Sequence, residues 1–123
     1  MFNNDINFSL WCDFIERDFL QDEFKNLLQI GAINGVTSNP SIFKAAFLSD
    51  SYKDVIGQMG KKYPKALYEA LAVQDIKIAA TKLLRHYANG DDGFVSIEVD
   101  PSFCDNAAAT VDEGARLHAE IGM

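Results

Sequence analysis

Residues 94–100 have the sequence FVSIEVD, and this stretch decides the expected fold. The turn-forming sequence NGDDG precedes it at 89–93, and Pro101 follows it. Its aliphatic side chains alternate with Ser96 and Glu98, which is typical of a short β-strand with one apolar and one polar face. We therefore predict a strand whose apolar face packs on helices and whose polar face carries a carboxylate.

Two further strands are expected upstream of this one. Residues 8–15 (FSLWCDFI) form a short, almost continuous apolar run, which favours a strand buried on both faces. Residues 33–37 (INGVT) favour a second strand, and the sequence SNP at 38–40 ends it. A residue that can cap a helix, followed by proline, also signals that a helix begins there.

Apolar residues spaced three and four apart predict helices around these strands. The expected helices cover 16–31 with Gly31 at its end, 41–48, 50–59 with a weak pattern, 64–87 with Asp75 as a candidate cap for a break inside it, and 107–121. Strands that alternate with helices indicate an α/β fold with parallel strands. Because residues 41–93 are too many for one crossover, we expect extra helices between the second and third strands.

Polar side chains gather near the carboxyl end of each expected strand. Asp13 lies on the first strand, Thr37 and Asn39 share a face at the end of the second, and Ser96 and Glu98 share a face of the third. The carboxyl ends of parallel strands are where α/β folds build their sites. An ionised carboxylate in a buried strand is costly unless it has a partner. We therefore predict one wall of an active site, with two carboxylates for proton transfer and hydroxyl and amide groups that hold a polyol.

Each of these residues also has a purely structural interpretation. Asp13 could bond to loop amides, and Asn39 could serve only as a helix cap. Glu98 could be exposed if its strand lies at the edge of the sheet, and Ser96 could be a small packing residue. Asp100, directly before a proline, is expected to be a turn or cap residue. The agreement of three strands in position and polarity favours a site.

Composition excludes several classes of protein. The chain has 123 residues, of which 48% are hydrophobic and 24% charged, which indicates one globular domain or less. Eleven basic residues against eighteen acidic ones give a net charge of −7, which argues against binding to nucleic acid or an anionic membrane. Cys12 and Cys104 lie far apart without CxxC spacing, so we expect neither a disulfide scaffold nor a structural zinc site.

The amino-terminal sequence does not resemble an export signal. Residues 1–7 contain no Lys or Arg, and charged residues interrupt the apolar stretch that follows. No run approaches the roughly 20 apolar residues that a membrane span needs. We therefore expect a soluble, cytoplasmic protein.

Three motifs resemble those of the transaldolase family, in order and in spacing. LWCDFI at 10–15, GVTSNPSIF at 35–43 and DGFVSIEVDP at 92–101 are similar to the family's first three strand motifs. ALAVQDI at 70–76 is similar to a helical segment between strands two and three. The resemblance implies that residues 1–123 are the N-terminal part of the domain. This part comprises the first three βα units of a (β/α)8 TIM barrel, with extra helices between strands two and three.

The same resemblance implies an enzyme activity. Transaldolases transfer a dihydroxyacetone unit between sugar phosphates in the pentose phosphate pathway, from sedoheptulose 7-phosphate to glyceraldehyde 3-phosphate, giving erythrose 4-phosphate and fructose 6-phosphate. They use a Schiff base on a lysine and need no metal or organic cofactor. By motif, Asp13 resembles the acid/base that takes the proton of the C4 hydroxyl, and Glu98 resembles the carboxylate that forms and breaks the Schiff base through a water. Asn39 and Thr37, with Ser96 beside them, resemble residues that hold the substrate.

The Schiff-base lysine has no counterpart in this chain. In the family it lies on the fourth strand, in a segment resembling IKVPAT, whereas this sequence stops at Met123. Barrels of this kind typically have about 250 residues. We expect a truncated or split transaldolase that is inactive alone. The alternative is a non-catalytic half barrel that self-associates or pairs with a chain supplying the rest, since unpaired strand edges favour association.

Overall fold

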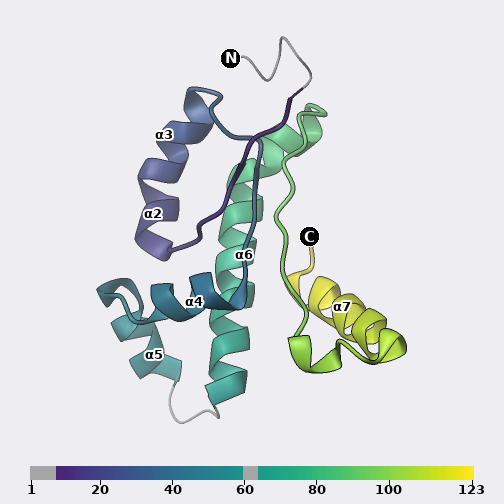
Figure 1. Cartoon of the computed structure of the whole chain (residues 1–123). Coiled ribbons are helices and arrows are strands. Elements are labelled where there is room, and N and C mark those ends of the chain that lie inside the picture. Colours follow the sequence, from purple (N-terminus) through teal and green to yellow (C-terminus); the bar gives the residue numbers. More distant parts are fainter. Residues whose placement is uncertain (1–7, 60–63) are drawn as a thin grey trace.

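The parallel pairing predicted for the first two strands is present in the structure. The structure, a computed structural model, describes residues 8–59 and 64–123. β1 (Trp11–Cys12) pairs in parallel with β2 (Gly35–Val36), with Cys12 opposite Val36 (Figure 1). A single parallel bridge joins Val36 to Val95, so the segment that was expected to be the third strand runs alongside β2.

The expected strands are longer than the observed ones, and the third is not a strand. Val36 donates to the carbonyl of Phe94 at 3.0 Å and accepts from the amide of Ser96 at 3.0 Å, which ties the segment to β2 at one residue only. A regular ladder needs several consecutive pairs, so one bridge leaves residues 94–100 extended but unassigned. The expectation of three complete βα units is therefore not met in the described residues, which form a two-stranded sheet.

A glycine lets the neighbouring strands approach closely. A Cβ at Gly35 would lie 2.6 Å from the Trp11 ring and 3.0 Å from the carbonyl oxygen of Phe94, which no larger residue tolerates without a shift. The rings of Trp11 and Phe94 stack with their centroids 6.4 Å apart. Trp11, Gly35 and Phe94 therefore share one face, while Val36 and Val95 belong to the core on the opposite face.

The helix expected over 16–31 is two helices. α2 (Arg17–Gln21) and α3 (Glu23–Gln29) are separated at Asp22, whose φ of −124° and ψ of −87° are not helical. The predicted end is confirmed, because Gly31 has a φ of 69° and follows the last turn of α3.

The extra helices between β2 and the third segment are confirmed. They are α4 (Pro40–Phe47), the 3₁₀ turn η1 (Asp50–Tyr52), α5 (Lys53–Met59) and α6 (Pro64–Ala88), and they are followed after the third segment by η2 (Pro101–Phe103) and α7 (Ala107–Ile121). The break expected at Asp75 is wrong, since α6 is continuous and Asp75 is buried within it. The cap expected at Asp100 is confirmed, because its carboxylate accepts the amide of Ser102 at 2.9 Å.

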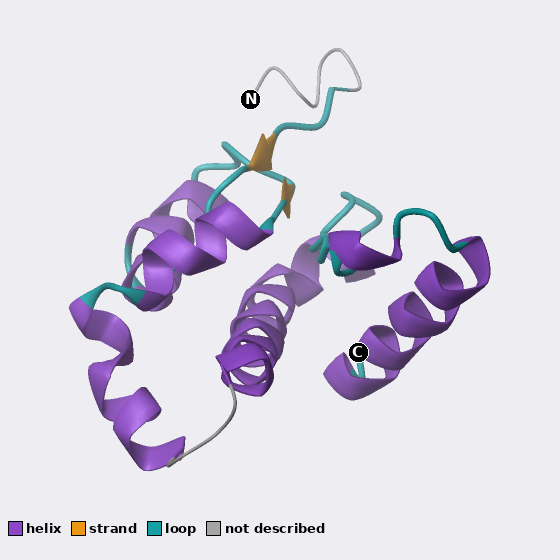
Figure 2. Ribbon diagram, turned by 60° about the horizontal axis from the view of Figure 1, so that its bottom comes forward, coloured by secondary structure: helices purple, strands orange, loops and turns teal. Residues whose placement is uncertain are grey.

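Helices cover the Val36 face of the sheet. Figure 2 shows α6 lying between the α2–α5 helices and α7, as does Figure 1. The main core joins buried side chains of α2, α3, β2, α4 and α6, namely Leu20, Phe24, Val36, Phe43, Ala72, Ile76, Ala79 and Leu83, together with Ile15 and Ile33. Among the described residues, no helix is long and apolar enough to cross a membrane.

Candidate functional site

Asp13 and Thr37 meet directly after the two paired strands. The amide of Thr37 donates to the carbonyl of Cys12 at 2.8 Å, which continues the parallel pairing beyond β2. This places the following side chains side by side, and Oγ1 of Thr37 donates to Oδ1 of Asp13 at 2.7 Å. The Asp13 carboxylate is exposed, while Thr37 is half-buried. A hydroxyl that holds a solvent-accessible carboxylate in one orientation is a suitable arrangement for proton transfer.

Asn39 does serve as a helix cap. Its Oδ1 accepts the amide of Ile42 at 3.0 Å, and Pro40 occupies the first position of α4. This is the structural role that the sequence left open. Capping uses only the side-chain oxygen, so the Nδ2 amide group has no hydrogen-bond partner within 8–59 and 64–123 and is available to a ligand.

Ser96 joins the second and third segments through its backbone. Its carbonyl accepts the hydroxyl of Ser38 at 2.6 Å, and its amide donates to Val36. Val95 and Ile97 pack against the main core, so the alternation of an extended chain puts Ser96 and Glu98 on the opposite side. This is the side on which Phe94 stacks with Trp11.

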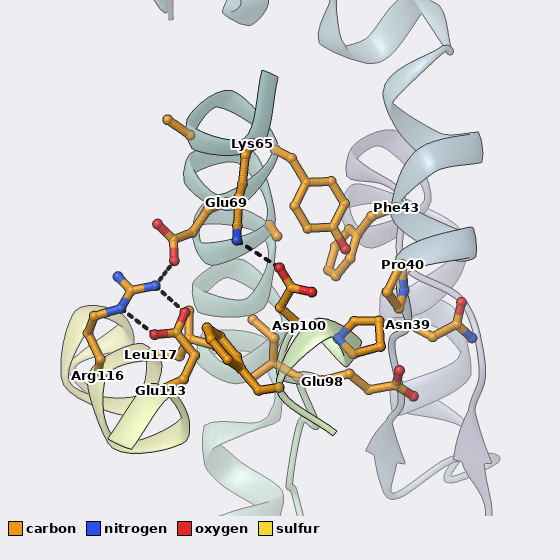
Figure 3. A pocket seen from close by; sticks show the side chains of 16 residues that line it. Asn39, Pro40, Phe43, Lys65, Glu69, Glu98, Asp100, Glu113, Arg116 and Leu117 are labelled. Atoms are coloured by element: carbon orange, nitrogen blue, oxygen red, sulfur yellow. Dashed lines mark hydrogen bonds and ion pairs between the residues drawn. The ribbon is translucent and has the colours of Figure 1, made fainter. Parts of the chain in front are cut away.

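Glu98 lies at the edge of a cavity. Its side chain is exposed and forms no ion pair in the described part of the chain, as the edge-strand interpretation anticipated. The cavity has a volume of about 650 Å³ and lies among α4, α6, η2 and α7. Figure 3 shows Asn39 and Glu98 together at one edge of it, with Arg116 at the opposite edge. Two more predicted site residues therefore line the same cavity.

Aromatic and charged residues form the walls of this cavity. Apolar walls come from Phe43, Tyr68, Ala72, Ile97, Phe103 and Leu117. Lys65 pairs with Asp100 at 2.7 Å, and Arg116 pairs with both Glu69 and Glu113. Sequence reasoning did not identify these rim pairs, because their partners lie up to 47 residues apart.

The rim pairs shift the pKa values of their members. The hydrogen bond from Lys65, supported by the Ser102 amide, lowers the pKa of Asp100 from 3.8 to about 2. The same contact raises the pKa of Lys65, and the hydrogen bonds to Glu113 and Glu69 raise the pKa of Arg116. Both cations are therefore occupied by carboxylates, which leaves Glu98 as the uncompensated charge among the lining residues.

A buried ionic cluster begins four residues after Asp13, at Arg17. The guanidinium of Arg17 donates to Asp75 at 2.7 and 3.0 Å, and the Tyr52 hydroxyl donates to the same carboxylate. Burial and the adjacent carboxylate raise the pKa of Tyr52, so its hydroxyl keeps its proton and remains a donor. Burial also raises the pKa of Asp75, against the opposing effect of the bonds from Tyr52 and Arg17.

The sequence contained a signal for this cluster that our reading missed. Asp75 lies four residues after Leu71 and one before Ile76, on the apolar face of α6. An acidic residue on a core-facing helical position needs a buried partner, and the sequence could not say which of the distant cations supplies it.

The described lysines all lie on helices rather than strands: Lys25, Lys44, Lys53, Lys65, Lys77 and Lys82. Lys61 and Lys62 lie outside the described residues. Within the described ranges, no three His, Cys, Asp or Glu side chains come close enough to hold a metal ion.

Comparison with known proteins assigns the family. Residues 10–123 match the family model described as Transaldolase/Fructose-6-phosphate aldolase. The chain belongs to this family. The resemblance found in the three strand motifs is thereby confirmed, and membership of the transaldolase family implies a TIM barrel. The described residues themselves form a helix-rich α/β structure with a two-stranded sheet.

Individual transaldolases show how much of the family's length is present. The transaldolase of Campylobacter jejuni (strain RM1221) is 53% identical over 117 residues, which are 94% of this chain and 36% of that protein. The transaldolase of Helicobacter pylori (strain ATCC 700392 / 26695) is 47% identical over 112 residues, which are 89% of this chain and 35% of that protein. The chain thus spans about a third of the length of the curated relatives it matches.

Proposed function

We propose that this chain supplies the acid/base part of a transaldolase active site, as the N-terminal portion of an incomplete barrel domain. The observation that carries the proposal is the 2.7 Å hydrogen bond from Thr37 to Asp13, at the carboxyl ends of two paired parallel strands. Sites of α/β barrels lie at this end of the strands. The substrates proposed are sugar phosphates of the pentose phosphate pathway, and the proposed location is the cytoplasm.

Each site residue has a distinct part in the proposed reaction. Asp13 takes the proton of the substrate's C4 hydroxyl while the bond between C3 and C4 breaks, and Thr37 keeps its carboxylate oriented. Glu98 transfers protons through a water as the Schiff base forms and is hydrolysed, which suits an exposed carboxylate that has no ion pair with any described residue. Asn39 holds substrate hydroxyls with its Nδ2 group, and Ser96 is a further contact to the substrate. No metal or organic cofactor takes part.

The Schiff-base lysine is proposed to lie outside this chain. A lysine nucleophile needs a desolvated environment, and each described lysine is on a helix. The 123-residue chain is therefore proposed to be inactive alone and to act with the remaining strands of a barrel. Borohydride reduction in the presence of fructose 6-phosphate should leave no adduct on the chain, and a stable adduct on any of its lysines would contradict this.

The test of the site uses an enzyme that joins residues 1–123 to the remaining residues of the Campylobacter jejuni relative. In this joined enzyme, Asp13→Ala should slow carbon–carbon cleavage about 10²–10⁴-fold in single-turnover experiments, with a smaller effect on substrate binding. Glu98→Gln should instead slow the formation and hydrolysis of the Schiff base. Asp112→Ala, at an exposed position on α7, is the control and should behave as the unsubstituted enzyme. If Asp13→Ala changed only KM, the acid/base role would be wrong.

A second candidate function is association with another chain through the sheet face that carries Trp11 and Phe94. Phe94 is 50% exposed although it stacks on Trp11, and Phe8, Leu10 and Phe14, which flank Trp11 in the sequence, are also exposed. Exposed aromatic side chains favour contact with another chain, as does a sheet whose β1 edge has no strand partner among the described residues. Sedimentation of the 123-residue chain tests this: a dimer that Phe94→Ser converts to monomer supports association, and a monomer at all concentrations excludes self-association.

A further inference from the structure

The segment that carries Asp13 ends at Arg17, which belongs to a hydrogen-bond cluster with Tyr52 and Asp75. The Arg17 guanidinium donates from Nε at 3.0 Å and from Nη2 at 2.7 Å to Oδ1 of Asp75. The Tyr52 hydroxyl donates to Oδ2 of Asp75 and accepts the backbone amide of Arg17 at 2.9 Å. The Asp75 side chain is fully buried, and that of Arg17 is only 16% exposed. Three elements, α2, η1 and α6, are thus joined at the residue where α2 begins.

Contacts at Cys12, Ile15 and Arg17 anchor the chain on both sides of Asp13. On one side, the carbonyl of Cys12 accepts the amide of Thr37 at 2.8 Å. On the other side, Ile15 is fully buried in the main core and Arg17 is bound to Tyr52 through its own backbone. The short segment that carries Asp13 is therefore anchored at both of its ends.

Stability alone explains such a cluster poorly. Removing two charges from water is costly, and apolar residues of similar volume often stabilise a fold as well or better than a buried ion pair. Apolar contacts do not supply direction, whereas each hydrogen bond restricts an angle as well as a distance. The Tyr52 hydroxyl also accepts a hydrogen bond from the backbone amide of Arg17, two residues after Ile15.

We propose that Tyr52 and Asp75 are positioning residues, which hold the segment between β1 and α2 so that the Asp13 carboxylate stays within hydrogen-bond distance of Thr37. Both side chains are fully buried in the core and act through the backbone at Arg17. This inference rests on the acid/base role proposed for Asp13. It adds that the active geometry depends on a hydrogen-bond cluster that does not itself contact the substrate.

The first test follows amide hydrogen exchange in the 123-residue chain. Tyr52→Phe keeps the ring and its packing but removes the hydroxyl that links Arg17 to Asp75. The Thr37 amide should then exchange about tenfold faster or more, while amides in the middle of α7 keep their rates, because the change is local rather than global. Tyr87→Phe is the matched control, since its hydroxyl has no hydrogen bond among the described residues and the residue is 58% exposed. Equal acceleration at Thr37 and in α7 would mean general destabilisation and would overturn the proposal.

The second test is a double-mutant cycle in the joined enzyme. Tyr52→Phe should lower kcat about tenfold or more with little change in KM, because a displaced base loses rate more than binding. Combined with Asp13→Ala, it should cause no further loss, since the group it positions is gone. An equal loss in both backgrounds, or no loss in either, would overturn the positioning role. An Asp13→Ala enzyme with normal kcat would instead refute the proposed function, so the two failures are distinguishable.

A milder variant covers the case in which Tyr52→Phe does not fold. Arg17→Lys keeps the positive charge and the backbone bond to Tyr52 but loses the two-pronged contact with Asp75. The same exchange pattern and the same non-additivity are expected. If neither variant folds at low temperature, the cluster supports the whole fold rather than the position of Asp13, and the proposal is wrong.

Discussion

The hydroxyl of Thr37 lies 2.7 Å from Oδ1 of Asp13 and donates a hydrogen bond to it, although the two residues are 24 positions apart in the sequence. The parallel pairing of β1 with β2 brings them together, because it continues one residue further through the amide of Thr37 and the carbonyl of Cys12. Register and chemistry are thus linked: a slip of one residue would turn one of the two side chains to the opposite face.

Replacement of Thr37 tests this contact in the joined enzyme. Thr37→Val keeps the shape but removes the donor, so cleavage should slow about 10- to 100-fold, the equivalent of a hydrogen bond to a charged group worth about 1.5–3 kcal/mol. Thr37→Ser keeps the hydroxyl and should retain most of the rate. Single-turnover kinetics measures both, and a loss in Thr37→Ser with none in Thr37→Val would show that the methyl group, not the hydroxyl, matters.

The two roles of Asn39 can be separated by a pair of variants. Asn39→Ala removes the cap of α4 and should lower the free energy of unfolding by about 1 kcal/mol, measured by urea denaturation of the 123-residue chain. Asn39→Asp keeps a capping oxygen and should be close to the original stability. It nevertheless loses the Nδ2 donor, so in the joined enzyme both variants should raise KM and lower kcat. Full activity in Asn39→Asp would exclude the proposed contact with substrate.

The close approach at Gly35 predicts a costly substitution. Gly35→Ala places a Cβ 2.6 Å from the Trp11 ring, so the ring or the strand must shift, at a cost of about 1–3 kcal/mol in stability. Urea denaturation followed by the fluorescence of Trp11, the single tryptophan, reports both the loss and the shift.

Gly57 provides the matched control for that substitution. It lies inside α5, and a Cβ added there would meet no side chain or neighbouring element of the described residues within 4 Å, so Gly57→Ala should raise stability by about 0.5–1 kcal/mol through helix propensity. Equal effects at the two glycines would contradict the close packing of β1 against β2.

The ion pair between Lys65 and Asp100 predicts a dependence of stability on pH. Because the pKa of Asp100 is lowered from 3.8 to about 2 in the folded chain, its contribution is present above pH 4 and is lost as the pH falls from 4 to 2. Asp100→Asn should therefore have a lower Tm than the original chain at pH 5–7, and the difference should vanish towards pH 2. Added salt should also reduce it, since Lys65 is exposed. A difference in Tm that is independent of pH would mean that the charge of Asp100 does not cause it, and would contradict the contribution of the ion pair.

Local sequence patterns predicted most of the secondary structure. The helix expected over 107–121 has the same bounds in α7, and Gly31 ends α3 as expected, because capping and apolar spacing act within a few residues. The break at Asp22 was missed, since the apolar spacing across it is compatible with one continuous helix. The third strand was predicted from its alternation, but a strand also needs partners, and in the described residues only Val36 pairs with it.

The sequence predicted part of the candidate site and left the rest open. Alternation along each strand is enough to predict that polar residues collect near the carboxyl ends, namely Asp13, Thr37, Asn39, Ser96 and Glu98, and their catalytic roles stay predictions. The sequence left open both the cap formed by Asn39 and the exposure of Glu98. The first depends on how the backbone enters α4, and the second on whether another segment covers residues 94–100.

By itself the sequence determined the family, the positions of nearly all helices and the strand ends at which polar residues collect, because motifs and periodicity are properties of neighbouring residues. Only the tertiary structure decided which side chains meet. Thr37 reaches Asp13 through strand register, and Arg17 reaches Asp75 across 58 residues through the packing of α2 on α6. Such contacts depend on the distance between elements in space, and a buried carboxylate on a helix face indicates that a partner exists without indicating where in the chain it lies.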